Sequence, residues 1–363
     1  MNRRDFLDPK YLAQSATGLL DAAGALPKFA EAQPSKRPEG KLLRYSRRAM
    51  ATTFELILPY NTDNALSAAQ DIFDEIDALE QQLTVYRDDS EVSRLNQRAS
   101  KGPIGVERSL LDLLLLAQEI HQATEGAFDI TSGALSKVWG FYRREGSIPD
   151  EDALTEALQR VGMDHVVLED ARQTVRFLKP GLEINLGSIG KGFALDCVGQ
   201  LLQQRWKCSD VMLHGGQSSI LALGNEPGTT NGWQVGIRHP YEPERRLAIL
   251  RLRDRALGTS AITYQHLEHE GKKLGHILDP RNGWPAQGLA GATAVAPTAA
   301  VADALATAFF ILGVEGTSRF CQTYTHIGAV LLPEEPGAAP VIFNLTPEEI
   351  QLSAGFGHSQ QKQ

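Results

Sequence analysis

One apolar stretch, VADALATAFFILG at residues 301–313, limits what this chain can fold into. Its small and aliphatic residues predict a helix in a protein core, because no polar stripe is left to face water. Only Asp303 and Thr307 interrupt the apolar pattern. A separation of four residues is about 400° of α-helical rotation, so both side chains lie on one face, one turn apart.

The pair Asp303 and Thr307 could hold a metal ion. Burying a carboxylate costs free energy unless a cation or hydrogen-bond donors meet it. Mg²⁺ prefers oxygen ligands and commonly takes one or two protein groups, while phosphate oxygens and water complete its octahedron. The alternative, which the spacing alone favours, is that Asp303 accepts amide hydrogens near the start of the helix and Thr307 bonds back to its own helix.

The overall charge limits the partners. The 363 residues carry a net charge of -8 and a pI near 5.7, whereas nucleic-acid binding needs a basic surface. We therefore expect no nucleic-acid partner. A nucleotide ligand remains compatible with this charge, because backbone amides and one bound cation can hold a small phosphate group.

The chain shows neither a clean membrane span nor a disulfide framework. The best apolar run, residues 294–313, contains Pro297 and Asp303 and falls short of about 20 uninterrupted apolar residues, so we expect no transmembrane helix. The three cysteines have no zinc spacing and an odd count, which predicts buried thiols.

The domain organisation predicted from composition is one folded domain with two tails. Residues 1–43 predict an N-terminal tail, residues 44–346 the domain and residues 347–363 a C-terminal tail. The start, MNRRDFL, resembles a twin-arginine export signal, but the segment after it is weakly apolar and interrupted by Asp21. Export to the periplasm and a cytoplasmic location with a non-exported tail, which we favour, both stay open.

The order of helical and strand patterns predicts an α+β fold rather than a doubly wound sheet, because it lacks a regular βαβα rhythm. Helical spacing marks residues 63–82, 109–124 and 150–162. Residues 183–206 predict a strand, a glycine turn and a helix. Strands are expected at 51–60, 164–170, 173–180, 210–216, 219–224, 233–240 and 246–257, with the second and third forming a hairpin.

Two glycine turns are candidate anion sites. NLGSIGKGFALD, residues 185–196, holds Gly187, Gly190 and Lys191 at a strand-to-helix turn, where free amides and a helix N-terminus favour an anion. It matches neither a Walker loop nor GxGxxG, and an ordinary glycine turn explains it as well. HGGQSS brings Gly215 and Gly216 into a second turn, where a ligand could approach the backbone.

Two further segments carry polar candidates. In HILDPRNGWP, His276 could act in acid–base chemistry, and Asp279 could orient it or cap the turn, although a lone histidine is more often structural. In GAFDITSGALSKVWGFY, Asp129 lies among small residues before three aromatic ones, which could cover a planar ligand or pack in the core.

Each of these signals is weak on its own, but their order and spacing along the chain together form a strong one. The series MATTFEL, SEVSRLN, GAFDITSGALSKVWGF, NLGSIGKGFALD, GGQSSILALG, GWQVGIRHP, HILDPRNGWP and ADALATA resembles the ApbE family, the flavin transferases that use FAD to modify proteins with FMN. The match runs from about residue 46 to about residue 345. It implies an ApbE-like fold of mixed, mainly antiparallel sheets packed with helices, with a nucleotide cleft between two halves.

The resemblance implies a magnesium-dependent reaction. A threonine hydroxyl of an acceptor protein would attack the FAD pyrophosphate, FMN would become linked through a phosphoester, and AMP would leave. Asp303, Thr307 and the backbone carbonyl of Gly190 would hold the Mg²⁺, which neutralises charge on the phosphate oxygens.

The resemblance also assigns the remaining candidates. Lys191 would lie by the phosphates, and His276, with Asp279 beside it, would take the threonine proton. The implied FAD-binding set is Met50, Asp129, Gly187, Lys191, Gly215, Gly216, Ser260 and His276.

Several positions depart from the family pattern. Ala51 stands where glycine is usual, Asn185 and Gln217 where aspartate is usual, and Ala261 where glycine is usual. Two of these changes remove negative charge that would organise a metal or a ribose. They leave two alternatives open, a non-catalytic paralogue that binds FAD or another nucleotide, and a pyrophosphatase that splits FAD to FMN and AMP.

Overall fold

The computed structural model describes most of the domain predicted above. The predicted export segment and nearly all of the N-terminal tail lie outside the described residues. So does the end of the C-terminal tail. The described residues are 40–143, 146–242, 244–262, 267–269, 272–335 and 337–353.

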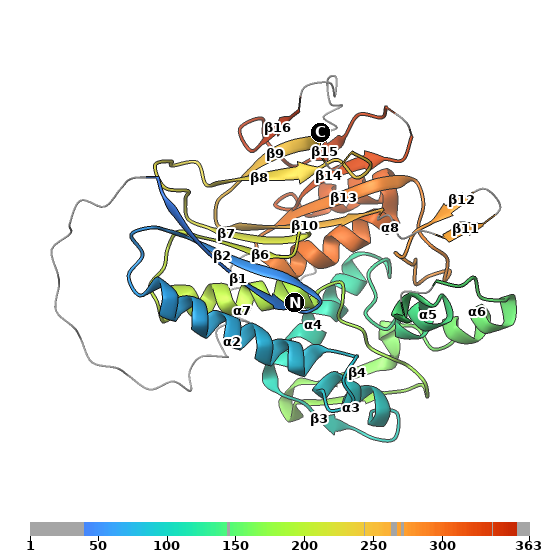
Figure 1. Ribbon diagram of the computed structural model, residues 1–363. Helices are drawn as coiled ribbons and strands as arrows, with labels where there is room; N and C mark the ends of the chain where they lie inside the picture. The colour runs from blue at the N-terminus through green and yellow to red at the C-terminus, as the bar shows by residue number, and fades with distance from the viewer. Residues whose placement is uncertain are drawn as a thin grey trace.

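A large antiparallel sheet forms the centre of the molecule (Figure 1). Each neighbouring pair in it is antiparallel, which confirms the predicted α+β class. In the described part of the chain this sheet has eight strands, in the order β1 (Leu42–Ala49), β2 (Thr52–Pro59), β6 (Val211–Gly215), β7 (Ser219–Leu223), β10 (Arg255–Ala261), β13 (Leu289–Ala296), β14 (Gly328–Pro333) and β15 (Val341–Phe343).

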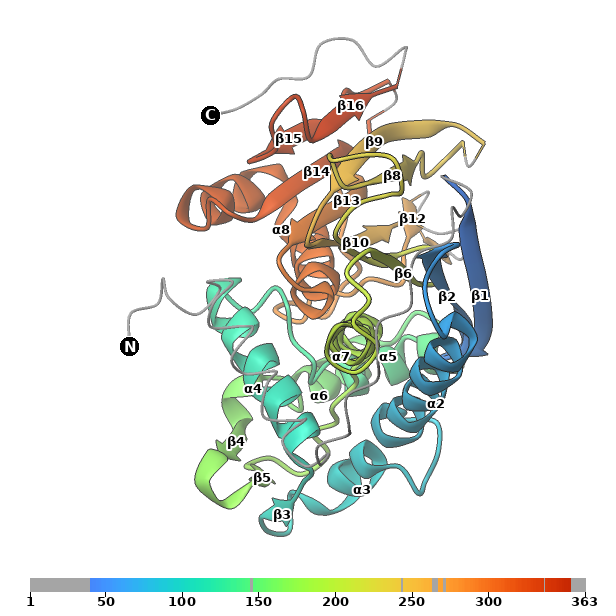
Figure 2. The same ribbon diagram turned by 90° about the vertical axis from the view of Figure 1, so that its left-hand side faces the viewer.

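Helices cover one face of this sheet, as Figures 1 and 2 show together. They are α2 (Ala65–Leu83), α7 (Gly190–Gln204) and α8 (Ala299–Thr323). The predicted core helix is α8, which packs against β10 and β13. Strand β13 is buried at every position, because apolar layers cover both of its faces.

A second sheet covers the opposite face of the large one. It pairs β9 (Arg246–Leu252) with β8 (Trp233–Arg238) on one side and β16 (Ile350–Leu352) on the other. Buried and exposed residues alternate strictly along β8, as expected of a strand with one face in a core. Trp233 is fully buried there and donates its indole N–H to the Leu223 carbonyl, 2.8 Å away.

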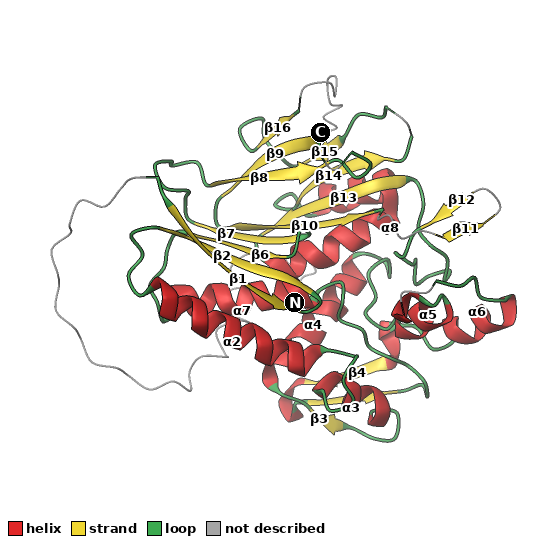
Figure 3. Ribbon diagram, in the orientation of Figure 1, coloured by secondary structure: helices red, strands yellow, loops and turns green. Residues whose placement is uncertain are grey.

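The smaller elements lie below and beside the central layers, as Figure 3 shows by element type. The predicted hairpin is confirmed as β4 (Val166–Glu169) and β5 (Thr174–Phe177). The predicted strand at the start of segment 183–206 is wrong: only an isolated bridge joins Glu183 to Ser132. The smaller elements below and beside the central layers are α3 (Glu91–Arg98), β3 (Ile104–Gly105), α4 (Arg108–Ala123), α5 (Gly133–Val138), α6 (Glu151–Leu158), β4 (Val166–Glu169), β5 (Thr174–Phe177), β11 (Leu267–His269) and β12 (Lys272–Leu274).

Two predicted boundaries at the C-terminal side need correction. The stretch 246–257 contains two strands rather than one, because the chain turns at Asp254 (φ 50°) and passes from the small sheet into the large one. Strand β16 lies inside the predicted tail 347–363. Ile350 is buried opposite Leu250 of β9, so the folded body extends to at least Leu352.

Helix α8 is long and apolar enough to cross a membrane by length and composition alone, with 67% of its most apolar window buried in the protein. Its backbone leaves helical geometry at Gly313 (φ 66°). The uninterrupted first part is therefore about 14 residues, or roughly 21 Å, shorter than the roughly 30 Å of a bilayer core. The helix behaves as the core helix that its sequence predicts.

Candidate metal and nucleotide site

Glycines bring α7, α8 and β10 into close contact. A β-carbon on Gly192 of α7 would stand 2.1 Å from the Ala299 carbonyl oxygen, and one on Gly258 of β10 would stand 2.3 Å from the Ala302 carbonyl oxygen. Only a residue without a side chain fits at these two contacts. The backbone of α8 therefore lies against both neighbours at the level of Asp303.

Asp303 is buried between these elements, with only 6% of its surface exposed. The Gly192 amide donates to its Oδ2 over 2.8 Å. The Lys191 ammonium is 3.7 Å from the same oxygen, longer than the 2.7–2.9 Å typical of a charge-assisted hydrogen bond. Burial raises the pKa of the Asp303 carboxyl, and Lys191, the Ser219 hydroxyl and the Gly192 amide limit that rise. The carboxylate is thus only partly compensated.

Thr307 lies one turn further along α8, as predicted. Its Oγ1 is 3.2 Å from the Ser260 hydroxyl of β10. The bond back to the Asp303 carbonyl is long, at 3.5 Å. The hydroxyl therefore faces across to the sheet, and the structure brings Asp303, Thr307, Ser260 and Lys191 into one cluster.

The start of α8 shows why Asp303 does not cap its own helix. Asp196 of α7 accepts from the Ala299 and Ala300 amides over 2.7 and 2.8 Å. Thr298 accepts from the Val301 amide over 3.4 Å. The first free amides of the helix are satisfied without Asp303. Burial raises the pKa of Asp196 to about 7, although the two amides oppose this.

The glycine turn before α7 lies beside the cluster. The Asn185 side-chain oxygen accepts from the Gly187 amide over 2.9 Å, an Asx-turn that asparagine closes as well as aspartate. The Lys191 ammonium is 3.5 Å from the Gly187 carbonyl oxygen. Gly190 is the first residue of α7, two positions before the amide that binds Asp303.

The other glycine turn lies against the β1–β2 hairpin. Met50 and Ala51 form its two-residue turn, both with positive φ (48° and 58°). The Gly216 amide donates to the Thr53 carbonyl over 2.9 Å. Gly216 (φ 71°) leaves no room for a β-carbon beside Thr52. The Gly216 turn therefore lies against Thr52 and Thr53, which directly follow the turn of Met50 and Ala51.

Two contacts extend this turn. The Gln217 side-chain oxygen accepts from the Arg238 guanidinium of β8 over 3.0 Å. The Thr259 amide donates to the Ser218 carbonyl over 2.8 Å, so the turn reaches β10. Glutamine thus keeps an acceptor oxygen at this position but lacks the negative charge of the aspartate in the family pattern.

His276 and Asp279 belong to one loop, closed by a bond from the Ala286 amide to the Ile277 carbonyl over 2.8 Å. Although His276 is exposed, nearby atoms desolvate its imidazole and lower its pKa. Asp279 caps the turn: Oδ1 accepts from the Arg281 amide over 3.0 Å, and the Arg281 side chain binds both of its oxygens over 2.8 and 2.7 Å. Of its two predicted roles, these contacts favour the cap.

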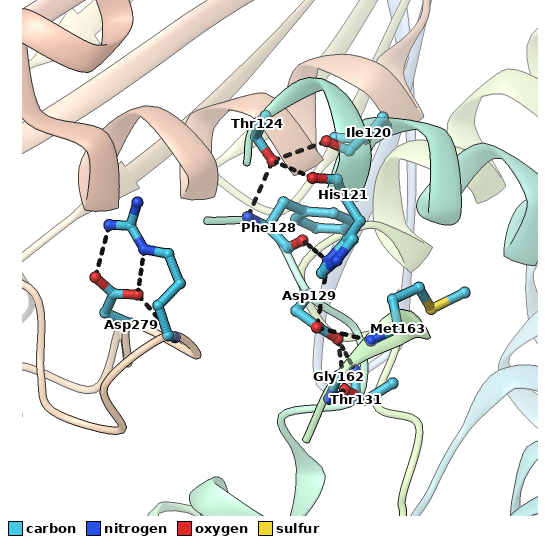
Figure 4. A network of polar contacts seen from close by, with 10 residues as sticks. Ile120, His121, Thr124, Phe128, Asp129, Thr131, Gly162, Met163 and Asp279 are labelled. Atoms are coloured by element: carbon cyan, nitrogen blue, oxygen red, sulfur yellow. Dashed lines mark hydrogen bonds and ion pairs between the residues drawn. The ribbon is translucent and has the colours of Figure 1, made fainter. Parts of the chain in front are cut away.

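Asp129 is the centre of a buried network (Figure 4). Its Oδ1 accepts from the amide and hydroxyl of Thr131, and Oδ2 accepts from the Met163 amide. His121 lies 3.2 Å from Oδ2. Burial alone would raise the pKa of Asp129, but these partners outweigh it and lower the value. Because these partners occupy both of its oxygens, Asp129 stabilises the surrounding fold rather than contacting a ligand directly.

A cavity of about 300 Å³ opens beside the Asn185 turn. Tyr142 and Lys137 line it, and Tyr142 stacks on Tyr86 with 4.9 Å between ring centroids. Trp139, by contrast, is fully buried. Of the aromatic residues predicted to cover a planar ligand, Tyr142 therefore reaches a cavity and Trp139 packs in the core.

The donors at Asp303 fit a hard cation. Among the described residues, no three histidine, cysteine, aspartate or glutamate side chains gather into a metal site. A cation at Asp303 would thus rely on one carboxylate, the Thr307 hydroxyl and a backbone carbonyl such as that of Gly190. Mg²⁺ tolerates such a small set because phosphate oxygens and water supply the rest.

Sequence reasoning missed Asp196 and Ser219. Asp196 ends the quoted glycine motif, and its helical position predicts only a polar side chain on α7. Ser219 begins a buried strand and interacts with Asp303. Both act through contacts between segments far apart in the chain, which no local pattern reveals.

The fold and the cluster define an α+β protein with oxygen donors around a buried carboxylate at the junction of two helices and a sheet. A family model described as "ApbE family" matches residues 50–331. The chain therefore belongs to the ApbE family, as the sequence motifs indicated.

Curated relatives and a solved structure agree with this membership. The FAD:protein FMN transferase of Treponema pallidum (strain Nichols) is 33% identical over 280 residues, 73% of this chain and 77% of that protein. The Haemophilus influenzae enzyme of the same name is 32% identical over 289 residues, covering 76% and 82%. The ApbE protein of Thermotoga maritima has a TM-score of 0.74 at 25% identity, covering 83% of this chain and 96% of that one.

Proposed function

We propose that this protein is an FAD:protein FMN transferase that moves FMN from FAD to a threonine of an acceptor protein. Relatives about one third identical over most of the chain carry this name. The observation that carries the proposal is the incompletely compensated Asp303 carboxylate, held against the first turn of α7 beside Lys191. A phosphate group with a bound cation would complete this cluster.

Asp303, Thr307 and the Gly190 carbonyl would hold Mg²⁺. When bound, the ion withdraws charge from the pyrophosphate oxygens and stabilises the charge that develops there. Asp303 supplies a carboxylate whose burial makes a nearby cation favourable. Lys191 adds a second positive charge on the phosphate side, since its ammonium lies near both Asp303 and Gly187.

The reaction replaces the phosphoanhydride bond of FAD with a phosphoester to the threonine oxygen. The threonine oxygen bonds to the phosphorus of the FMN half, the bond from that phosphorus to the bridging oxygen breaks, and AMP leaves with that oxygen. His276 takes the hydroxyl proton. Its lowered pKa keeps the imidazole neutral at pH 7 and therefore able to accept a proton.

The remaining predicted residues would place FAD. The Gly187 turn lies beside Lys191, the turn after Gly215 and Gly216 reaches β10 through Ser218, and Ser260 of β10 lies against Thr307. The cavity beside Asn185, with Tyr142 on its wall, offers room for a planar group. Asp129 would act indirectly, by holding the segment that leads to α5.

The test is incubation with FAD and Mg²⁺, with and without a threonine-containing acceptor protein, followed by protein mass measurement and AMP detection. We expect a mass increase of the acceptor equal to one FMN and an equal amount of AMP. Asp303→Ala should lower the rate by about 100-fold or more, as removal of a main electrostatic group does. Identical rates for Asp303→Ala and unaltered protein would refute the proposal.

Two other outcomes would replace it. Free FMN without any acceptor would identify a pyrophosphatase. Stoichiometric FAD bound without turnover would identify a binding protein. The structure gives these alternatives little support, because Asn185 and Gln217 keep the acceptor oxygens that aspartate would provide.

A further inference from the structure

We propose that Asp196 is a positioning residue that sets the separation between the metal donors of α7 and those of α8. The proposal deepens the proposed function and rests on it. Asp196 points from α7 to the start of α8, where its two oxygens accept from the Ala299 and Ala300 amides over 2.7 and 2.8 Å.

A second contact repeats this one a turn away. The Gly192 amide of α7 donates to the Asp303 carboxylate of α8 over 2.8 Å. Gly192 and Asp196 are four residues apart on α7, and Ala299 and Asp303 are four residues apart on α8. Hydrogen bonds therefore join the two helices at both ends of a single turn. Between these two hydrogen-bonded contacts, the Gly192 backbone lies directly against the Ala299 carbonyl, so the two helices cannot come closer together.

These two contacts between α7 and α8 matter because the proposed metal donors come from different helices. Gly190 belongs to the first turn of α7, whereas Asp303 and Thr307 belong to α8. Metal sites need donors held within about 0.5 Å of their working geometry. A small slide of α7 along α8 would therefore spoil the site while leaving each helix intact.

Thr298 offers a matched control for the ordinary capping role. It accepts from the Val301 amide of the same helix end, but it belongs to the segment leading into α8, so this hydrogen bond does not join α8 to α7. Loss of either cap should lower stability. Only loss of the Asp196 cap should also change the spacing between the helices.

The experiment measures Mn²⁺ binding without FAD, by electron paramagnetic resonance of the free ion, together with Tm. The variants are Asp196→Asn, Asp196→Glu and Thr298→Ala, with Asp303→Ala as the background for binding elsewhere. Asp196→Asn keeps one acceptor and puts an N–H donor against an amide. Asp196→Glu keeps the charge but adds a methylene between the helices, and it also carries the test if Asp196→Asn fails to fold.

We expect both Asp196 variants to raise the Kd for Mn²⁺ about tenfold, and Thr298→Ala to leave it within about twofold at a comparable loss of Tm. Equal Kd values in all three would overturn the positioning role. Weakening in Asp196→Asn alone would show that charge, not spacing, matters, and would overturn it too. If the unaltered protein binds no more Mn²⁺ than Asp303→Ala, the metal site of the proposed function fails as well.

Discussion

At the scale of single residues, Glu119 on α4 is an acidic residue outside the site in an environment that disfavours its charge. One of its carboxylate oxygens is buried and has no hydrogen-bond partner among the described residues. Burial raises the pKa of Glu119 to about 8. Because the folded state favours the protonated acid, Glu119 costs stability increasingly as the pH rises from about 4.5 to about 8.

We predict that Glu119→Gln stabilises the protein at pH 8 and changes little at pH 5. The amide cannot ionise, so the cost that grows with pH disappears. The residue is only half-buried and solvent screens it, so we expect a gain of about 1–2 kcal/mol at pH 8 rather than the full value of the shift. Urea denaturation at both pH values measures this. A constant difference between the two pH values would show that Glu119 does not titrate in this range.

At the scale of elements, the contact between α7 and α8 depends on one glycine and tolerates change at another. Gly192 meets the Ala299 backbone. Gly190, two residues earlier, has its nearest neighbour, the Leu186 β-carbon, 3.8 Å from the position of an added β-carbon. Close packing of the helices therefore requires glycine at position 192 but not at position 190.

We predict that Gly192→Ala destabilises the protein by about 3 kcal/mol or more, because backbone atoms of α8 would have to move. Gly190→Ala should be neutral or stabilising by up to about 1 kcal/mol, since alanine favours a helix. Thermal unfolding of both variants measures the contrast. Similar Tm values for the two would show that the helices can separate without cost.

At the scale of the whole molecule, the sequence predicted most helices and strands but not which sheet each strand belongs to. Periodicity located α2, α4 and the β4–β5 hairpin, and it placed Asp303 and Thr307 on one face of α8. It could not show that Asp303 meets Gly192, because that contact joins segments 111 positions apart. Nor could it assign β9 and β10 to different sheets, since only the polar residues 253–255 separate their apolar residues.

The position of β16 gives a prediction at this scale. A chain that ends at Thr346 should lose about 2–3 kcal/mol of stability, because it loses the buried Ile350 and the ion pair of Glu349 with Arg255 (2.8 Å). It also exposes the edge of β9, which favours aggregation. Denaturation and light scattering measure both effects. A chain that ends at Ser353 is the control, because it keeps every described strand.

The complete burial of β13 has a consequence for how the protein opens. Its amide hydrogens are covered by α8 on one side and by the small sheet on the other. Such amides exchange with deuterium only when the whole domain unfolds, whereas peripheral hairpins open at lower free energy. The helix that carries Asp303 packs on this strand, so opening of the peripheral hairpins leaves in place the oxygen donors that we propose for a cation.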